Sequence, residues 1–176
     1  VKEYLTPWGQ TLLVPEGFCT TTDAQGDVLM YPEGDVSANP SAKMPRSGYF
    51  FDSIIRQQPI EEDKLDPADN LEEYGPISDA DLDYWRETTQ KARATGKAVI
   101  AGFGGTALGD IAHIPGKKLK HPKGIRDITE WYLSILIRPG YIKAVFEQQT
   151  EIALENLARI AAAVGDNVDA VYLCGA

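Results

Sequence analysis

Cysteine is scarce in this chain of 176 residues, with Cys19 and Cys174 far apart and in no Cys-x-x-Cys pair. This spacing argues against a structural disulfide and a closed zinc site, and it favours a reducing, cytoplasmic compartment. The chain also lacks His-x-x-x-His and His-Glu-x-x-His patterns, so we expect no metal ligands within the segment. Long apolar runs are missing too, and a membrane-spanning helix is therefore not expected.

Positive charge is outnumbered, because 17 Lys and Arg stand against 26 Asp and Glu, which gives a formal net charge of -9. Such a balance repels nucleic acid and anionic membranes, so we expect neither as a partner. The sequence opens on Val1, without an initiator Met or a secretory leader, and it closes on a strand-like run. Chemistry in α/β folds sits beyond the carboxyl ends of strands, so we expect an internal segment of a larger enzyme.

Residues 1–60 are expected to form a region rich in β-hairpins followed by an anchor segment. Short β-prone runs alternate with turns that contain Gly, a pattern typical of antiparallel hairpins. Residues 36–48 are rich in Ser, Pro and Gly and are expected to form a loop, whereas residues 49–55 are apolar and should anchor onto the core. Residues 61–77 are acidic and are expected to form a solvated connector. The β-prone runs are Tyr4–Thr6, Gln10–Val14, Phe18–Thr22 and Val28–Tyr31.

Residues 78–176 alternate between helical and strand patterns, which predicts βα units. Ser78 is a plausible N-cap for a helix that should run to about Ala94, before a stop at Gly96. A buried strand should follow at 97–103, and another should close the chain at 168–176. Two helices should connect these strands, because the pattern predicts one over about 125–137 and a longer one that starts at Pro139. The apolar stripe of the first of these two helices is expected to be Ile125, Ile128, Tyr132, Ile135 and Leu136.

A strand, two helices and a strand form a parallel crossover, and parallel sheets need both faces covered. Two such strands alone do not meet this need, so we expect either a sector of a larger barrel or a sheet edge buried against another copy. The fold class predicted from the sequence is therefore α/β, as a partial (β/α)8 barrel with a β-hairpin region before it. A homo-oligomer is expected for the same reason.

The stretch 102–116 is rich in Gly and follows a predicted strand directly, where ligands bind in α/β folds. Gly104 and Gly105 allow a close backbone approach to a ligand, and Thr106 supplies a hydroxyl. Asp110 and His113 would share a face of a short helix, where a carboxylate beside an imidazole suits proton transfer or anion binding. These five residues are the candidate substrate-binding set. The alternative is a tight turn, a helix cap and a surface histidine without a further role.

Three further features stand out, and the first two allow two interpretations each. The basic loop, defined as residues 117–124, could draw an anionic substrate such as a polycarboxylate, or it could be a solvated loop. Cys174 could line a pocket or be a small buried apolar residue. Arg56 is expected to make a local pair with Asp52.

The chain resembles the uroporphyrinogen decarboxylase superfamily in three stretches, Gly48–Ile60, Lys97–Thr106 and Val168–Ala176. This resemblance implies a (β/α)8 barrel enzyme. One branch decarboxylates a tetrapyrrole in porphyrin biosynthesis without a cofactor. The other transfers methyl groups between corrinoid proteins and acceptors such as coenzyme M or tetrahydrofolate, with zinc as the metal.

Two departures favour the methyltransferase branch. His113 stands where the decarboxylase has a substrate-contacting tyrosine, and the hairpin region 16–35 is longer than the decarboxylase needs. The resemblance places the decarboxylase's catalytic aspartate before Val1 and the methyltransferase's zinc ligands after Ala176. We therefore expect catalytic groups, zinc and corrinoid to lie outside this segment, with a small-molecule or tetrapyrrole substrate and a corrinoid protein as partners. A binding or assembly module without activity is the non-enzymatic alternative.

Overall fold

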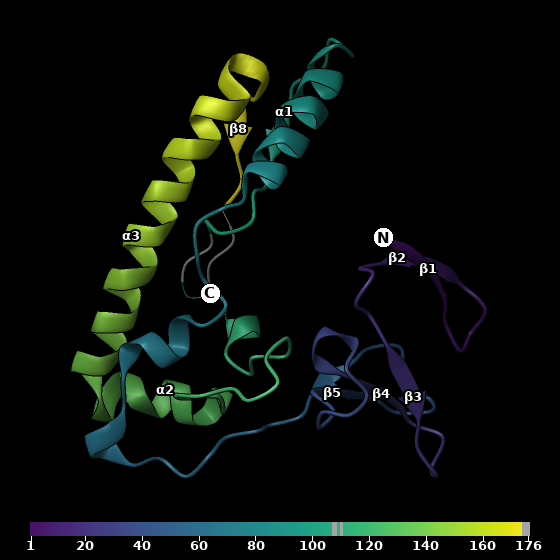
Figure 1. Cartoon of the computed structure of the whole chain (residues 1–176), viewed down its shortest axis with the longest axis vertical. Coiled ribbons are helices and arrows are strands. Elements are labelled where there is room, and N and C mark those ends of the chain that lie inside the picture. Colours follow the sequence, from purple (N-terminus) through teal and green to yellow (C-terminus); the bar gives the residue numbers. More distant parts are fainter. Residues whose placement is uncertain (107–108, 110, 174–176) are drawn as a thin grey trace.

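The structure is a computed structural model, and it describes residues 1–106, 109 and 111–173. These residues form three α-helices and eight short strands in three separate sheets (Figure 1). The expected α/β class is therefore confirmed in its coarse form. None of the three sheets closes into a barrel within the described residues, and the finer prediction of a partial barrel is not confirmed.

The first two sheets are antiparallel and hold the N-terminal strands, as the hairpin pattern predicted. β1 (Lys2–Leu5) pairs with β2 (Thr11–Val14). The second sheet has the order β3-β4-β5-β6, so that consecutive strands lie next to each other. Its members are β3 (Thr20–Thr22), β4 (Val28–Met30), β5 (Ala42–Met44) and β6 (Asp52–Ser53).

Two expectations for the end of this region were wrong. The stretch 36–48 is not only a loop, because Ala42 and Met44 of β5 are buried and pair with β4. The Ser- and Pro-rich flanks of β5 hid this three-residue strand. The stretch 49–55 does not anchor onto the core through its aromatic start, since Tyr49 and Phe50 are exposed. Phe51 is half-buried and packs edge-on against Phe18.

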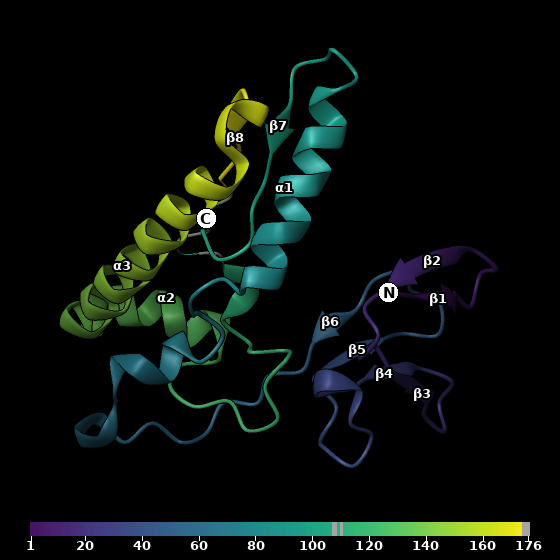
Figure 2. The same cartoon turned by 45° about the horizontal axis from the view of Figure 1, so that its top comes forward.

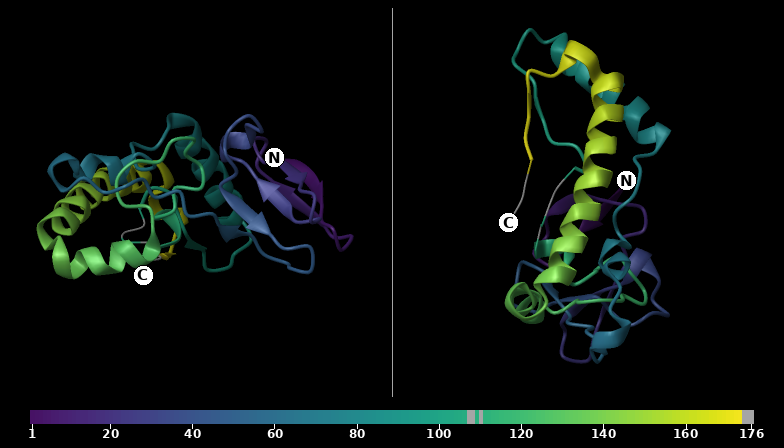
Figure 3. Two further views of the ribbon diagram at one scale, coloured as in Figure 1. Left: turned by 90° about the horizontal axis from the view of Figure 1, so that it is seen from below. Right: turned by 90° about the vertical axis from the view of Figure 1, so that its left-hand side faces the viewer.

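The helical part follows the predicted order closely. Ser78 caps α1 (Asp79–Arg93) by accepting a hydrogen bond from the Asp81 N–H at 3.1 Å, as expected. α2 (Ile128–Ile137) turns at Arg138 into α3 (Pro139–Val164), which begins with its proline and ends at Gly165. α1 and α3 lie side by side, and α2 crosses the far end of α3 (Figures 1 and 2). The N-terminal sheets form a lobe to one side of these helices (Figure 3).

The expected apolar stripe of α2 was right at its start and wrong beyond it, because Ile125 is buried and Ile128 packs on the first core cluster, while the later members turn outward. Trp131 and Ser134 are buried, whereas Tyr132, Ile135 and Leu136 are exposed. Trp131 packs against Phe146 of α3, so the contact with α3 decides which face turns inward. Because α2 is apolar on nearly every side, its sequence pattern did not single out that face.

The third sheet joins β7 (Ile100–Ala101) and β8 (Ala170–Val171) as parallel neighbours, which confirms the predicted crossover pairing. Asp169 fixes the start of this pair. Its carboxylate accepts a hydrogen bond from Val99 N–H at 2.8 Å and pairs with Arg93 of α1 at 2.8 Å. Both strands are shorter than expected, and β8 is exposed rather than buried. Helices cover only one face of this sheet within the described residues, which leaves Ile100 72% exposed.

Two clusters make up the core. The first surrounds Ile125, Trp131 and Val145, and the second surrounds Ile77, Phe103 and Ile160. The stretch 61–77, expected to be a solvated connector, is part of this core: Leu65 and Leu71 pack on the first cluster, and Ile77 belongs to the second. Its acidic residues hid these apolar positions. None of the helices in the described ranges combines the length and the apolar character needed to cross a bilayer.

Candidate functional site

The glycine-rich turn leaves β7 at the edge where the parallel strands end. Gly104 is exposed, and a Cβ built on it would meet no atom within 4 Å. Gly105 has a φ of +72°, and a Cβ there would lie 2.8 Å from Nδ2 of Asn156. Gly105 thus has the positive φ expected of these glycines and lies close to α3, whereas a close approach of a ligand to this turn stays a prediction.

Asn156 is fully buried and holds this turn in place. Its Nδ2 donates hydrogen bonds to the carbonyls of Gly75 at 3.0 Å and Gly105 at 2.9 Å, and its Oδ1 accepts from Ile77 N–H at 2.9 Å. Thr106, also a predicted site residue, is 3% exposed, and its hydroxyl donates to the Phe103 carbonyl at 2.8 Å. Its hydroxyl hydrogen is thus used within the turn.

His113 ends a short 3-10 helix, Ile111–His113, and is exposed. Its ring centroid lies 6.1 Å from that of Tyr74. Asp110, the expected partner of His113, lies outside the described residues. The turn at Gly105 is joined to Gly75 through Asn156, and the imidazole of His113 lies against Tyr74. Both therefore lie near the short segment 73–75. The structure therefore gathers two of the four described site residues, Gly105 and His113, near this segment, while Gly104 faces solvent.

Glu73 of this segment is an acid whose pKa is shifted. Burial raises the pKa of its carboxyl, and the nearby positive groups of Arg126, His113 and Lys118 oppose that rise. Its Oε2 lies 3.5 Å from the Nη1 atom of Arg126, whose side chain is 2% exposed. A carboxyl with a raised pKa takes up a proton more readily than an exposed one, which suits proton transfer.

Arg126 is buried without loss of its polar contacts. Its guanidinium donates to the carbonyl oxygens of Lys123 and Asp69, and it pairs with Glu72 at 3.1 Å as well as with Glu73. A buried charge is tolerated when it is paired and hydrogen-bonded in this way. The guanidinium thereby ties the stretch 69–73 to the end of the basic loop.

Arg56 shapes the basic loop from the opposite side. Its Nη1 donates to the Leu119 carbonyl at 2.7 Å and its Nη2 to the Gly116 carbonyl at 2.6 Å. The expected local pair with Asp52 is therefore wrong, because these two carbonyls are satisfied instead. Burial and the neighbouring Arg126 lower the pKa of Arg56, and its Nε is buried without a partner among the described residues.

A pocket of about 510 Å³ opens beside Arg56 and is named here the cationic pocket. Its wall contains no carboxylate. Lys120 is held there by Asp35 at 2.8 Å, and this hydrogen bond, aided by Ser37, lowers the pKa of Asp35. Lys123 and His121 are exposed in the same wall. The full lining is Asn39, Arg56, Gln57, Gln58, Lys120, His121, Pro122 and Lys123.

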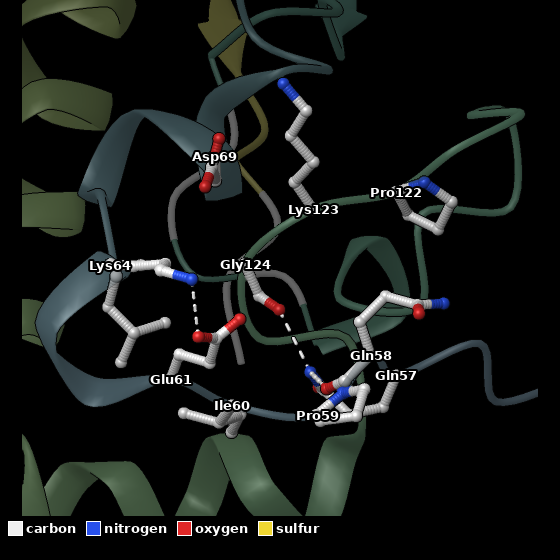
Figure 4. Close-up of a pocket in the computed structure, with 11 residues that line it drawn as sticks. Gln57, Gln58, Pro59, Ile60, Glu61, Lys64, Asp69, Pro122, Lys123 and Gly124 are labelled. Atoms are coloured by element: carbon white, nitrogen blue, oxygen red, sulfur yellow. Dashed lines mark hydrogen bonds and ion pairs between the residues drawn. The ribbon is translucent and has the colours of Figure 1, made fainter.

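A smaller pocket of about 160 Å³ adjoins the cationic pocket and shares part of its lining with it. Figure 4 shows Gln57 donating from Nε2 to the Gly124 carbonyl, at 3.1 Å, and Lys64 paired with Glu61 across the opening. Gln57 also accepts, through Oε1, from the N–H groups of Arg126 and Asp127. Gln57 is therefore fixed by main-chain hydrogen bonds in a wall that the two pockets share.

The remaining chemistry of the described residues is limited. Residues 1–106, 109 and 111–173 include no group of three or more His, Cys, Asp or Glu placed to hold a metal ion. Cys19 is a free thiol in the N-terminal lobe, and Cys174 lies outside the described residues. What this arrangement can do is attract and hold an anion, and raise the pKa of the Glu73 carboxyl.

Sequence reasoning singled out the basic loop and His113 as candidates, which stay predictions, but it missed Glu73, Arg126 and the contacts of Arg56. The acidic composition of 61–77 made Glu73 one of many surface carboxylates, although the apolar residues between those acids could have indicated burial. Arg56 and Arg126 lie 70 positions apart, and only their three-dimensional proximity identifies them. No protein-family model, curated protein or solved structure matches the chain.

Proposed function

We propose that the chain is a segment of an enzyme of the uroporphyrinogen decarboxylase superfamily, and that this enzyme is a corrinoid-linked methyltransferase. The segment would supply a sector of a (β/α)8 barrel together with an anion-binding wall. The parallel pairing of β7 and β8 through α2 and α3 supports the barrel sector. The three stretches of resemblance support the family.

The single observation that carries the proposed substrate class is the cationic pocket. Its lining holds Arg56, Lys120, His121 and Lys123 with no carboxylate. Positive groups in a low-dielectric cleft raise the local concentration of anions. The small acceptors of the methyltransferase branch are anionic, since coenzyme M carries a sulfonate and tetrahydrofolate carries carboxylates.

In this mechanism the residues of the segment bind and orient the substrate. The Lys123 ammonium attracts the anionic group, while Arg56 keeps the loop in the shape that exposes it. Burial raises the pKa of the Glu73 carboxyl, so that it takes up a proton at a higher pH than an exposed glutamate does. Zinc would supply thiolate activation when bound. The described residues do not offer a ligand set for it, so no step through zinc is assigned to them.

Porphyrin-forming decarboxylation is the second candidate, because an octacarboxylate tetrapyrrole also fits a cationic wall. His113 in place of the substrate-contacting tyrosine and the long hairpin region weigh against it. Two strands of that region, β3 and β4, belong to a four-stranded sheet in the lobe beside the helices, which adds to this argument.

Activity measurements on the enzyme that contains this segment test the proposal. The complete enzyme is given methylcobalamin with coenzyme M or tetrahydrofolate, and separately uroporphyrinogen. We expect methyl transfer to at least one acceptor and no release of carbon dioxide. Decarboxylation without methyl transfer would favour the second candidate. The absence of both activities would overturn the family proposal.

The anion-binding role is tested with Lys123→Gln in the same assay. We expect KM for the anionic acceptor to rise about fivefold with little change in kcat, because a single exposed charge contributes about 1 kcal/mol. Lys97→Gln is the matched control, as Lys97 is exposed and lines none of the pockets described above. Equal effects of the two substitutions would remove the cationic pocket from the substrate's path.

A further inference from the structure

A second, chemically different pocket lies on the other side of the basic loop and is named here the apolar pocket. It has a volume of about 500 Å³, and its walls come from the four-stranded sheet, the β2–β3 turn and the start of the basic loop. Pockets of 300–1,000 Å³ with mostly apolar walls are typical of small-molecule sites. The lining is Pro15, Gly17, Phe18, Met30, Tyr31, Glu33, Phe51, Lys117 and Lys118.

The apolar wall is built rather than incidental. Phe18 stacks edge-on against Tyr4 at 4.9 Å and against Phe51 at 6.2 Å, so its ring is held from two sides. The Tyr31 hydroxyl shares a hydrogen bond of 2.8 Å with Thr21 Oγ1, which satisfies its polar end and leaves the ring for packing. Aromatic rings fixed in this way present apolar surface to a ligand at low entropic cost.

The backbone around the apolar pocket is strained at one position. Glu33 has a φ of +53°, the left-handed value that residues other than glycine rarely adopt. A Cβ on Gly34 would lie 2.2 Å from the Gly17 carbonyl oxygen, so the two backbone segments that line the pocket approach each other closely here. Strained residues of this kind gather at ligand sites.

The polar groups of the rim carry net positive charge. Lys117 and Lys118 belong to the lining, and within the described ranges no carboxylate makes an ion pair with either. The third charged residue, Glu33, lies 3.8 Å from Lys120, which neighbours the cationic pocket. An apolar cavity with two lysines in its lining favours a ligand that has an apolar body and a negative head.

We propose that the apolar pocket binds a small amphipathic anion, with an aromatic or alicyclic body between Phe18, Met30 and Phe51 and a carboxylate at Lys117 and Lys118. This site is separate from the cationic pocket. The basic loop divides the two, because Lys117 and Lys118 line one and Lys120 to Lys123 line the other.

The test uses three probes of one shape and different charge: 2-naphthoate, 2-naphthamide and 2-naphthylmethylammonium. Their binding to the chain is measured by titration calorimetry, and the site is located by amide chemical-shift changes. We expect naphthoate to bind most tightly, with shifts confined to the residues around 15–18, 30–33, 51 and 117–118. Equal affinity for all three probes, or shifts elsewhere, would overturn the proposal.

Two variants separate the parts of the site. Lys117→Gln with Lys118→Gln should weaken naphthoate about tenfold and leave naphthamide within about twofold. Phe51→Ala should weaken both about tenfold, because it removes apolar contact rather than charge. Lys97→Gln with Lys143→Gln is the control of equal charge change. If naphthoate binding falls equally in this control, the effect is one of net charge and contradicts the proposed site. Unchanged naphthoate binding in folded Phe51→Ala would also contradict it.

Discussion

Asn156 gives the glycine-rich turn its conformation, and it does so with one buried amide. The amide joins α3 to main-chain groups of two stretches that are distant in the sequence, Gly75 and Ile77 in one and Gly105 in the other. Buried polar groups that lose such partners cost about 1–3 kcal/mol each. The turn is therefore fixed by the helix behind it rather than by its own glycines alone.

Gly105 and Gly104 should respond in opposite ways to the same substitution. Gly105→Ala places a Cβ against Asn156 at a positive φ and should lower the free energy of unfolding by about 2 kcal/mol. Gly104→Ala meets open space and should change it by less than about 0.5 kcal/mol. Urea unfolding followed by circular dichroism measures both. Similar losses in the two variants would mean that the turn is not held by Asn156.

At the scale of elements, α2 shows how a contact selects one face of an apolar helix. Trp131 is 4% exposed and packs on α3, whereas Leu136 is 81% exposed. Both residues are large and apolar, so their environment rather than their type determines what each contributes.

Trp131→Ala should lower the free energy of unfolding by about 3–5 kcal/mol, because it leaves a cavity beside Phe146. Leu136→Ala on the same helix should change it by less than about 0.5 kcal/mol. Thermal and urea unfolding of both variants provide the measurement, with helix content checked by circular dichroism. A larger loss for Leu136→Ala than for Trp131→Ala would contradict the orientation of α2.

The elements that sequence alone predicted are those with local signals. Ser78 as a cap, Pro139 as a first helical residue and the hairpin turns all act within a few residues, so their patterns are readable. The inward face of α2, the strand at Ala42–Met44 and the burial of Glu73 depend on partners distant in sequence. For the same reason the sequence indicated the basic loop and His113, but not the arginines that organise the site.

At the scale of the whole molecule, polar contacts join the N-terminal region to the helical part. Arg56 donates to the Leu119 carbonyl of the basic loop and to the Gly116 carbonyl just before it, and Lys120 of the loop pairs with Asp35. The extended segment after β6 runs from one part to the other (Figure 1). The loop is therefore positioned by both parts at once.

Removing the Arg56 guanidinium should loosen the loop without unfolding either part. Arg56→Met leaves the Gly116 and Leu119 carbonyls unpaired, and amide hydrogen exchange at Gly116 and Leu119 should accelerate about tenfold. Amides of α1 should keep their rates. Arg46→Met, at an exposed position, is the control of equal charge. Unchanged exchange in the loop would show that Arg56 does not hold it.

The path of the basic loop is determined through main-chain oxygens, because Arg56 and Arg126 donate hydrogen bonds to carbonyls there. The lysine ammonium groups take no part in these bonds. The main-chain oxygens of this stretch thus determine its conformation, whereas its lysine side chains determine which ligands it attracts. Exchanging the charges along this stretch could retarget either neighbouring cavity toward neutral or cationic molecules, with the backbone scaffold left as it is.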